Sequence, residues 1–126
     1  MTAELHTGRT DTLDVPVDSR EGADIKADDL KDIDTVLSYY TTHFDDTNPD
    51  RNVNIRLAQK RLNHAVVMAQ KDFSFNKYVG TRTPDKGYKQ APSYFENKLE
   101  QSTGGGVCQV STTLFNAALR AGLFIA

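Results

Sequence analysis

The last part of the chain constrains the fold most, because it combines three consecutive glycines with a long apolar stretch. Two stripes of side chains recur there at helical spacing: Val107, Val110, Leu114, Ala117 and Ala121 form one, and Cys108, Ser111, Thr112, Phe115 and Leu119 form the other. This spacing predicts a helix over residues 107–121, which Gly122 ends in the left-handed conformation. Because the helix is apolar on nearly every side, we expect it to be central and buried.

A second helix is predicted over residues 50–62. Either Thr47 or Asn48 is suited to cap it, and Pro49 fits the first helical position. The apolar side chains of this stretch gather on one face, which is typical of a surface helix. Asn63 is expected to end the helix, because asparagine tolerates the left-handed conformation.

Three further stretches predict strands. Residues 34–44 are rich in Val, Tyr, Thr and Phe, residues 65–68 form a short apolar run, and residues 123–126 are apolar throughout. The sequence therefore predicts an α+β fold, in which a small antiparallel sheet packs on the buried helix 107–121.

Charge divides the chain into two parts. Residues 1–35 hold ten acidic and four basic side chains, a net charge of −6, so the remaining 91 residues carry +4. The acidic part has few large apolar residues, which predicts a linker or the edge of another module over 1–35 and a folded domain over 36–126. Within the acidic part, residues 12–17 alternate polar and apolar and predict one edge strand.

Composition excludes several classes of protein. The net charge of −2 gives no electrostatic reason to expect nucleic-acid binding, and no apolar stretch approaches the roughly 18 residues that span a bilayer. The sequence carries no secretory leader pattern at its start. One cysteine allows neither an internal disulfide nor a multi-thiolate zinc site, and no histidine spacing suggests a metal centre or cofactor.

That single cysteine, Cys108, is predicted to lie in the first turn of the helix 107–121, directly after the glycines. The unpaired N–H groups and the dipole at a helix start favour a thiolate, and glycines such as Gly105 and Gly106 allow a ligand to approach the backbone. The amides of Asn76 and Gln109 are candidates to bind a carbonyl or a peptide. This set predicts a site for thiol-based acyl transfer.

Each of these residues also has a purely structural interpretation. Free cysteine is among the most buried residue types and usually packs as a small hydrophobe, and glycine runs commonly form plain loops. Asn76 is equally suited to cap a short helix, and Gln109 to satisfy buried backbone groups. The sequence leaves these alternatives open.

The blocks FSFNKYVGTRTPDKGYKQAP and GGGVCQVSTTLFNAALRAGL resemble the VanW family, named for an accessory protein of vancomycin-resistance clusters. The similarity also includes SYYTTHF and NPDRNVNIRLAQKRLNHAVV, so it covers residues 36–126. It implies that residues 1–35 are the tail of a preceding peptidoglycan-binding-type domain. It further implies a secreted or membrane-anchored bacterial protein that acts in the cell envelope on peptidoglycan or a cell-wall peptide.

The cysteine that opens a central helix is also similar to the transglutaminase-like fold, in which a histidine and an acid follow on adjacent strands. That similarity implies Cys108 as the nucleophile of a Cys–His–Asp relay. Here the chain departs from the pattern, because no histidine follows Cys108 and both His43 and His64 precede it. We therefore expect a C-terminally incomplete domain that is inactive as it stands.

Two functional hypotheses follow. In the first, which we favour for this chain, it is a non-catalytic binding or scaffold module of the cell envelope. In the second, the longer protein is a cysteine-dependent acyl transferase or hydrolase, such as a transpeptidase or amidase acting on peptidoglycan peptides, whose His and Asp lie beyond residue 126. The apolar end at residues 123–126 is expected to be an exposed edge, which favours either pairing with another copy of the chain or loose packing.

Overall fold

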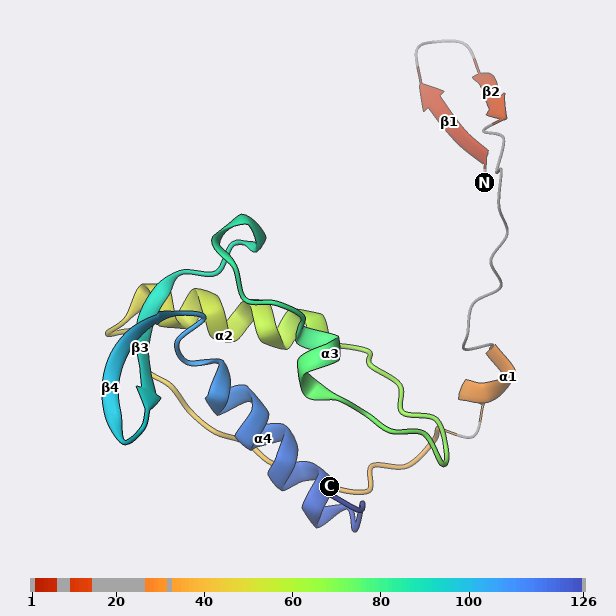
Figure 1. The fold of residues 1–126 in the computed structure, drawn as a ribbon. Helices are drawn as coiled ribbons and strands as arrows, with labels where there is room; N and C mark the ends of the chain where they lie inside the picture. Colours follow the sequence, from red (N-terminus) through yellow and green to blue (C-terminus); the bar gives the residue numbers. More distant parts are fainter. Residues whose placement is uncertain (1, 7–9, 15–26, 32, 126) are drawn as a thin grey trace. The chain divides into compact units, whose positions relative to one another are not determined.

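The computed structural model describes residues 2–6, 10–14, 27–31 and 33–125. The chain forms two compact units, Met1–Thr35 and Val36–Ala126, which are described separately below (Figure 1). The boundary between them falls where the net charge of the sequence changes sign.

The first unit contains a hairpin and one helical turn. Strands β1 (Thr2–His6) and β2 (Thr10–Asp14) pair antiparallel, and α1 spans Ala27–Leu30. The predicted strand over residues 12–17 overlaps the end of β2, while its last three residues lie outside the described part of the chain.

In the second unit, α2 spans Pro49–Leu62, close to the predicted bounds. The Asn48 side chain accepts a hydrogen bond from the Arg51 N–H at 3.0 Å, so of the two predicted caps Asn48 is the one used. The predicted left-handed ending at Asn63 is wrong. Asn63 is extended, and the positive φ of 62° falls on the next residue, His64.

The small antiparallel sheet of this unit is a hairpin of β3 (Gln90–Phe95) and β4 (Lys98–Thr103). Its two-residue connection, Glu96 and Asn97, has φ values of 47° and 62°. Positive φ at both central positions is the geometry of a type I′ turn, whose twist matches that of the strands. The sequence concealed this turn because it contains no glycine.

Helix α4 spans Val107–Arg120, as predicted to within one residue, and Gly122 follows it with a φ of 74°. The expectation that it is buried on nearly every side is wrong for this chain. Only Val107 and Val110 of this helix are buried. The later turns are covered on one side, where Thr113 and Ala117 are half-buried beside the segment before α2, and are open on the other, where Phe115 is 48% exposed and Leu119 is 54% exposed.

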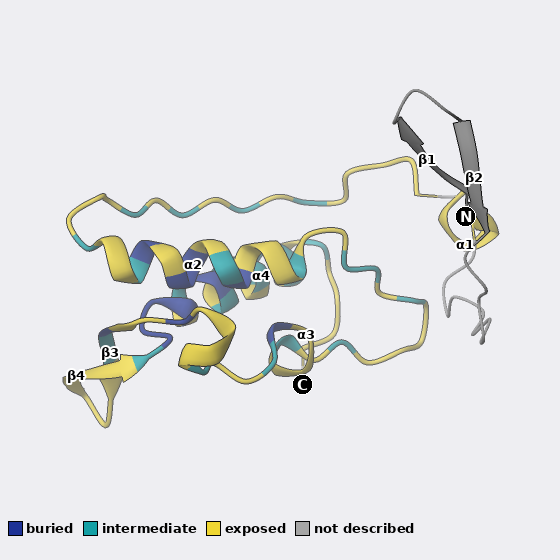
Figure 2. Cartoon of the chain, turned by 90° about the horizontal axis from the view of Figure 1, so that it is seen from above, coloured by how far each residue is buried: buried dark blue, intermediate teal, exposed yellow. Residues whose placement is uncertain are grey.

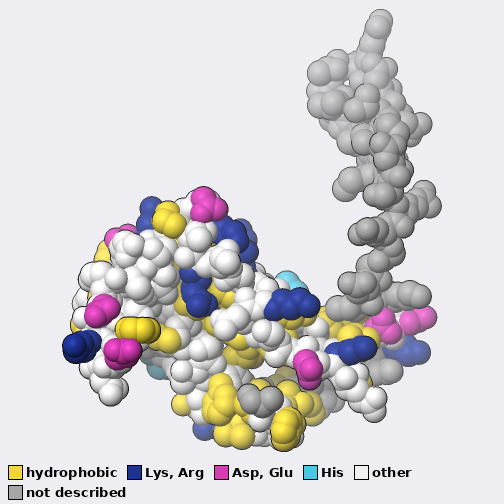
Figure 3. Space-filling view, in the orientation of Figure 1, with side chains coloured by type: hydrophobic (Ala, Val, Ile, Leu, Met, Phe, Trp, Pro, Cys, Tyr) yellow, Lys and Arg dark blue, Asp and Glu magenta, His cyan; other side chains and the backbone are white. Residues whose placement is uncertain are grey.

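The predicted strand at the end of the chain is absent. Leu123 to Ile125, which are the described residues of the predicted stretch 123–126, form no regular element and are exposed. Figure 3 shows apolar side chains gathered at this end of α4. No helix in the described part of the chain is long and apolar enough to cross a bilayer.

The core of the second unit lies where α2 meets the start of α4, the short helix α3 (Phe75–Val79) and the residues leading into β3 (Figure 2). Its buried apolar members are Ile55, Ala58, Val79, Tyr88, Val107 and Val110. The second unit is therefore α+β, as predicted, with a small antiparallel sheet beside helices; the sheet packs mainly through β3 on α2.

Residues 34–44 form no strand, and none of the strands that the structure describes pairs with them. Ser38, Tyr40, Thr42 and Phe44 are half-buried and the residues between them are exposed, which is the period of two that marks an extended chain. Residues 65–68 likewise form no strand. In both stretches strand-forming residues are present, but no neighbouring strand supplies the backbone hydrogen bonds that make a sheet.

A buried asparagine on α2 joins three parts of the second unit. Asn54 is fully buried, and its Nδ2 donates to the carbonyl oxygens of Lys89 at 2.9 Å and Gly105 at 3.0 Å. Its Oδ1 accepts from the Lys89 N–H at 2.8 Å. One side chain thus joins α2 both to the residue that leads into β3 and to the glycine turn.

Replacing this side chain should cost much of the domain's stability. Asn54→Ala leaves the Lys89 N–H and the Gly105 carbonyl without a partner and opens a cavity in place of a fully buried side chain, so we expect the free energy of unfolding to fall by about 3 kcal/mol. Urea denaturation followed by circular dichroism measures this change. Lys60→Ala, at an exposed position on the same helix, is the control and should shift the value by less than about 0.5 kcal/mol. Equal shifts for the two variants would contradict this role of Asn54.

Candidate functional site at the start of helix α4

Cys108 lies where the sequence predicts it, in the first turn of α4, and its side chain is exposed. Gly106 caps the helix with a φ of 97°, so Cys108 is the second helical residue. Ser111 donates its hydroxyl proton to the Cys108 carbonyl oxygen at 3.0 Å. Ser111 therefore bonds back to its own helix, and Cys108 is an accessible thiol at a helix start rather than a core residue.

The glycine turn before Cys108 is packed tightly against its neighbours. A Cβ placed on Gly105 would lie 2.2 Å from the Ala91 carbonyl oxygen, and one on Gly106 would lie 2.6 Å from Cγ of Arg51. Both glycines are buried. Glycine is therefore needed here because β3 and α2 lie too close to the turn to leave room for a side chain.

Gln109 uses its whole amide within the protein. Its Oε1 accepts from Arg51 Nη2 at 2.6 Å, and its Nε2 donates to Thr42 Oγ1 at 3.1 Å and to the His43 carbonyl oxygen at 2.9 Å. Gln109 thus ties α4 to α2 and to the extended segment before it. The structural interpretation of this residue fits these contacts.

Asn76 lies in the first turn of α3, where Ser74 rather than Asn76 provides the cap. Asn76 is exposed, and its Oδ1 accepts from Arg82 Nη1 at 3.4 Å. The stem of Arg82 in turn packs on Gly104, where a Cβ would lie 2.9 Å from it. The structure therefore links Asn76 to the glycine turn through Arg82.

The two histidines of the second unit are both exposed. The carbonyl of His43 is bound to Gln109, next in sequence to Cys108, whereas His64 follows the far end of α2. In the described residues no hydrogen bond joins Cys108 to either imidazole. Nor do three His, Cys, Asp or Glu side chains gather there into a group able to hold a metal ion.

A polar cavity of about 330 Å³ lies beside Gln109, between His43 and the start of α2. Asn52, which is buried, lines it and donates from Nδ2 to the Asp45 carbonyl oxygen at 2.8 Å. The hydroxyl and N–H of Thr47 both donate to the Asp45 carboxylate and hold its pKa below the ordinary value. The loop before α2 is therefore ordered by its own side chains and carries a fixed negative charge.

Sequence reasoning missed the residues that organise this site. Arg51 binds Gln109 and covers Gly106, and Asn54 binds Gly105, yet both lie on a helix whose sequence suggests an ordinary surface element. One signal was present. Asparagine is a poor interior helix residue, and the helix contains it at both 52 and 54.

A family model described as "VanW like protein" matches residues 50–126, more than half of the chain. This chain belongs to the VanW family. The VanW-family match begins in the first turn of α2 and includes the hairpin, the glycine turn and α4. It therefore contains the glycine-cysteine-glutamine block from which the family was predicted.

Two curated relatives support the assignment. The chain is 49% identical over 89 residues to the uncharacterized protein YoaR of Bacillus subtilis, which covers 71% of this chain and 29% of YoaR. It is 34% identical over 87 residues to the Vancomycin B-type resistance protein VanW of Enterococcus faecalis, which covers 68% of this chain and 32% of that protein. The chain thus spans about a third of the length of these VanW-family relatives. No solved structure matches it.

Two glycine substitutions distinguish the cost of a steric clash from the cost of a strained backbone conformation. Gly105→Ala places a methyl group within van der Waals overlap of β3, so we expect a loss of about 3 kcal/mol in unfolding free energy. The methyl group of Gly122→Ala meets no neighbouring atom, so only the positive φ is unfavourable, and we expect a loss of about 1 to 2 kcal/mol in unfolding free energy. Thermal and urea unfolding measure both; a larger loss for Gly122→Ala would contradict the packing.

Proposed function

We propose that this VanW-family chain is a non-catalytic binding module of the bacterial cell envelope, which takes peptidoglycan or a cell-wall peptide as its partner. The observation that carries the proposal is the glycine turn. Gly105 and Gly106 are closed by β3 and α2, and the amide of Gln109 is fully bound within the protein. The Gln109 amide, one of the groups that would hold a reacting carbonyl, is thus used to build the domain.

The proposed location is extracytoplasmic. It is supported by the relative from Enterococcus faecalis, whose name assigns it to vancomycin B-type resistance. Resistance to an antibiotic that acts on the cell wall is a property of the envelope, and a domain there meets peptides of the wall. In this role Cys108 serves no chemical step, and the domain contributes surface rather than a reaction.

The binding role predicts that the thiol is dispensable. Purified protein should sediment with purified peptidoglycan, and Cys108→Ser should sediment with the same affinity within about twofold. An exposed residue can be exchanged without loss of packing, so the fold of this variant should be unchanged. Loss of sedimentation by Cys108→Ser with its circular dichroism spectrum intact would refute the non-catalytic role.

A second candidate function is favoured by the exposure of Cys108 at the start of α4. An accessible thiol there can be reached by a substrate, as acyl transfer requires. The reaction would use Cys108 as the nucleophile and a histidine and an aspartate supplied from beyond residue 126 of a longer protein.

Alkylation kinetics distinguish the two functions. The acyl-transfer role predicts that Cys108 of the longer protein reacts with iodoacetamide at pH 7 faster than free cysteine does, because thiolate is the reacting form. The binding role predicts complete labelling, as expected for an exposed side chain, at a rate no higher than that of free cysteine. Mass spectrometry of samples quenched over time gives the rate, and denatured protein provides the unstructured reference.

A further inference from the structure

The extended segment Ser38–Phe44 carries an unused edge of backbone hydrogen-bonding groups. It is fastened to α4 mostly by side chains: Ser38 Oγ donates to the Ala117 carbonyl oxygen at 2.6 Å, and the hydroxyls of Thr42 and Thr113 lie 2.8 Å apart. Among the described residues, the carbonyl of His43 is its only main-chain group with a hydrogen bond, to Gln109. Such an edge is a template for an added strand.

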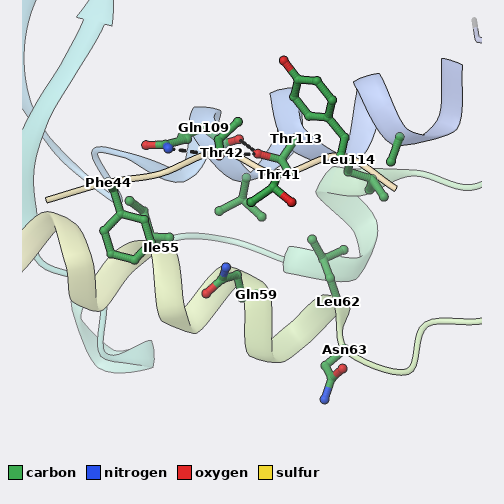
Figure 4. A pocket seen from close by; sticks show the side chains of 13 residues that line it. Thr41, Thr42, Phe44, Ile55, Gln59, Leu62, Asn63, Gln109, Thr113 and Leu114 are labelled. Atoms are coloured by element: carbon green, nitrogen blue, oxygen red, sulfur yellow. Dashed lines mark hydrogen bonds between the residues drawn. The ribbon is translucent and has the colours of Figure 1, made fainter. Parts of the chain in front are cut away.

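A groove runs beside this segment. Its walls come from the segment, from α2 and from α4, and it encloses about 400 Å³, within the range of ligand pockets (Figure 4). The floor and sides are largely apolar, with contributions from Ile55, Leu62, Val110, Leu114 and Ala117. No charged residue is among those that line it.

The two ends of the groove carry opposite charges. At one end the Arg120 guanidinium lies over the Tyr40 ring, 4.8 Å from its centroid. At the other end Asp45 and Asp46 directly follow Phe44. Thr47 keeps the pKa of Asp45 below its ordinary value, so this end stays negative in neutral solution. The residues that line the groove are therefore uncharged, and its Tyr40 end is positive. At the Phe44 end Arg51, which binds Gln109 and helps to lower the pKa of Asp45, offsets part of the charge of Asp45 and Asp46 and leaves that end net negative.

These charges select both the occupant and its direction. A strand added antiparallel to Tyr40–Phe44 would begin beside Asp45 and end beside Arg120, which suits a free amino group at its start and a free carboxylate at its end. Four residue steps of extended chain span about 13 Å, so the matching length is about five residues. A parallel peptide would meet like charges at both ends.

We propose that the groove between the segment Ser38–Phe44 and α2 binds a short extended peptide of about five residues, with uncharged side chains and both termini free. The peptide adds as an antiparallel strand to Tyr40–Phe44, with its amino group at Asp45 and Asp46 and its carboxylate at Arg120. This deepens the proposed binding function, on which it rests only for the source of the peptide.

A second copy of the chain fits this groove less well. Two copies paired antiparallel through the segment would be related by an axis perpendicular to the strands, which places both sets of helices on the same side. The α4 of the second copy would then occupy the space of the α2 that walls the groove. Self-association through the groove is one of the outcomes that the experiment separates.

The probe is the pentapeptide Val-Thr-Val-Thr-Val with free termini, titrated into 15N-labelled protein and followed by NMR. We expect saturable shifts of the amides of Tyr40 to Phe44, and about tenfold weaker binding of the same peptide after N-acetylation and C-amidation. Arg120→Glu should weaken the free peptide severalfold and leave the C-amidated peptide unchanged. Equal affinity of free and blocked peptides, no binding, or shifts confined to other regions would overturn the proposal.

Gln59→Trp provides the blocking variant, because Gln59 lines the groove and is exposed, so the bulky ring fills the groove without entering the core. Lys60→Trp, one position along α2 and not among the lining residues, is its matched control. Peptide affinity should fall at least tenfold in the first and stay unchanged in the second. Equal affinity in both variants would overturn the site.

Sedimentation with peptidoglycan separates this proposal from the function on which it rests. If the unaltered protein binds the pentapeptide but does not sediment with peptidoglycan, peptide binding in the groove is supported and the envelope-binding function is refuted. If the protein sediments and Gln59→Trp lowers neither sedimentation nor peptide affinity, the peptide site in the groove is refuted, while the envelope-binding function is still supported. Concentration-dependent dimerisation that Gln59→Trp abolishes would assign the groove to a second copy and overturn the proposal.

Discussion

The hydrogen bonds of the Asn54 side chain are the interaction on which the second unit depends. The amide imitates a peptide group, since it offers donors and an acceptor to the main chain at the start of β3 and a donor to the glycine turn. Without it, the start of β3 would contact α2 through apolar side chains alone, and the beginning of α4 would keep only the hydrogen bond from Arg51 to Gln109. Such contacts are not directional, whereas the amide fixes both elements in one register against the helix.

The glycine turn and Arg51 complete this arrangement. Because Gly105 and Gly106 lack side chains, the turn approaches β3 and α2 closely enough for its carbonyl to reach Asn54. Arg51 then covers the turn and binds Gln109, which holds the extended segment through Thr42 and His43. The residues that suggested a reactive centre in the sequence are thus largely the residues that fasten the elements together.

The sequence predicted the parts of the fold that are specified locally. Asn48 and Pro49 mark the start of α2, and the glycine at 122 marks the end of α4, because caps act within one turn of chain. The burial of α4 and the strand at 34–44 were not predictable in this way. Both depend on which other elements cover them, and apolar composition alone does not supply that information. Asn54 was missed for the same reason, since its partners lie 35 and 51 residues away.

Those separations also affect the order in which the domain folds. The hairpin of β3 and β4 closes through a two-residue turn, so its contacts are local and form on the microsecond scale of isolated hairpins. The hydrogen bonds of Asn54 instead close long loops, and the chain loses the conformational entropy of these loops before the bonds form. We therefore expect the hairpin and α2 to form early and independently, and the docking of the glycine turn onto Asn54 to be the late step that makes the domain cooperative.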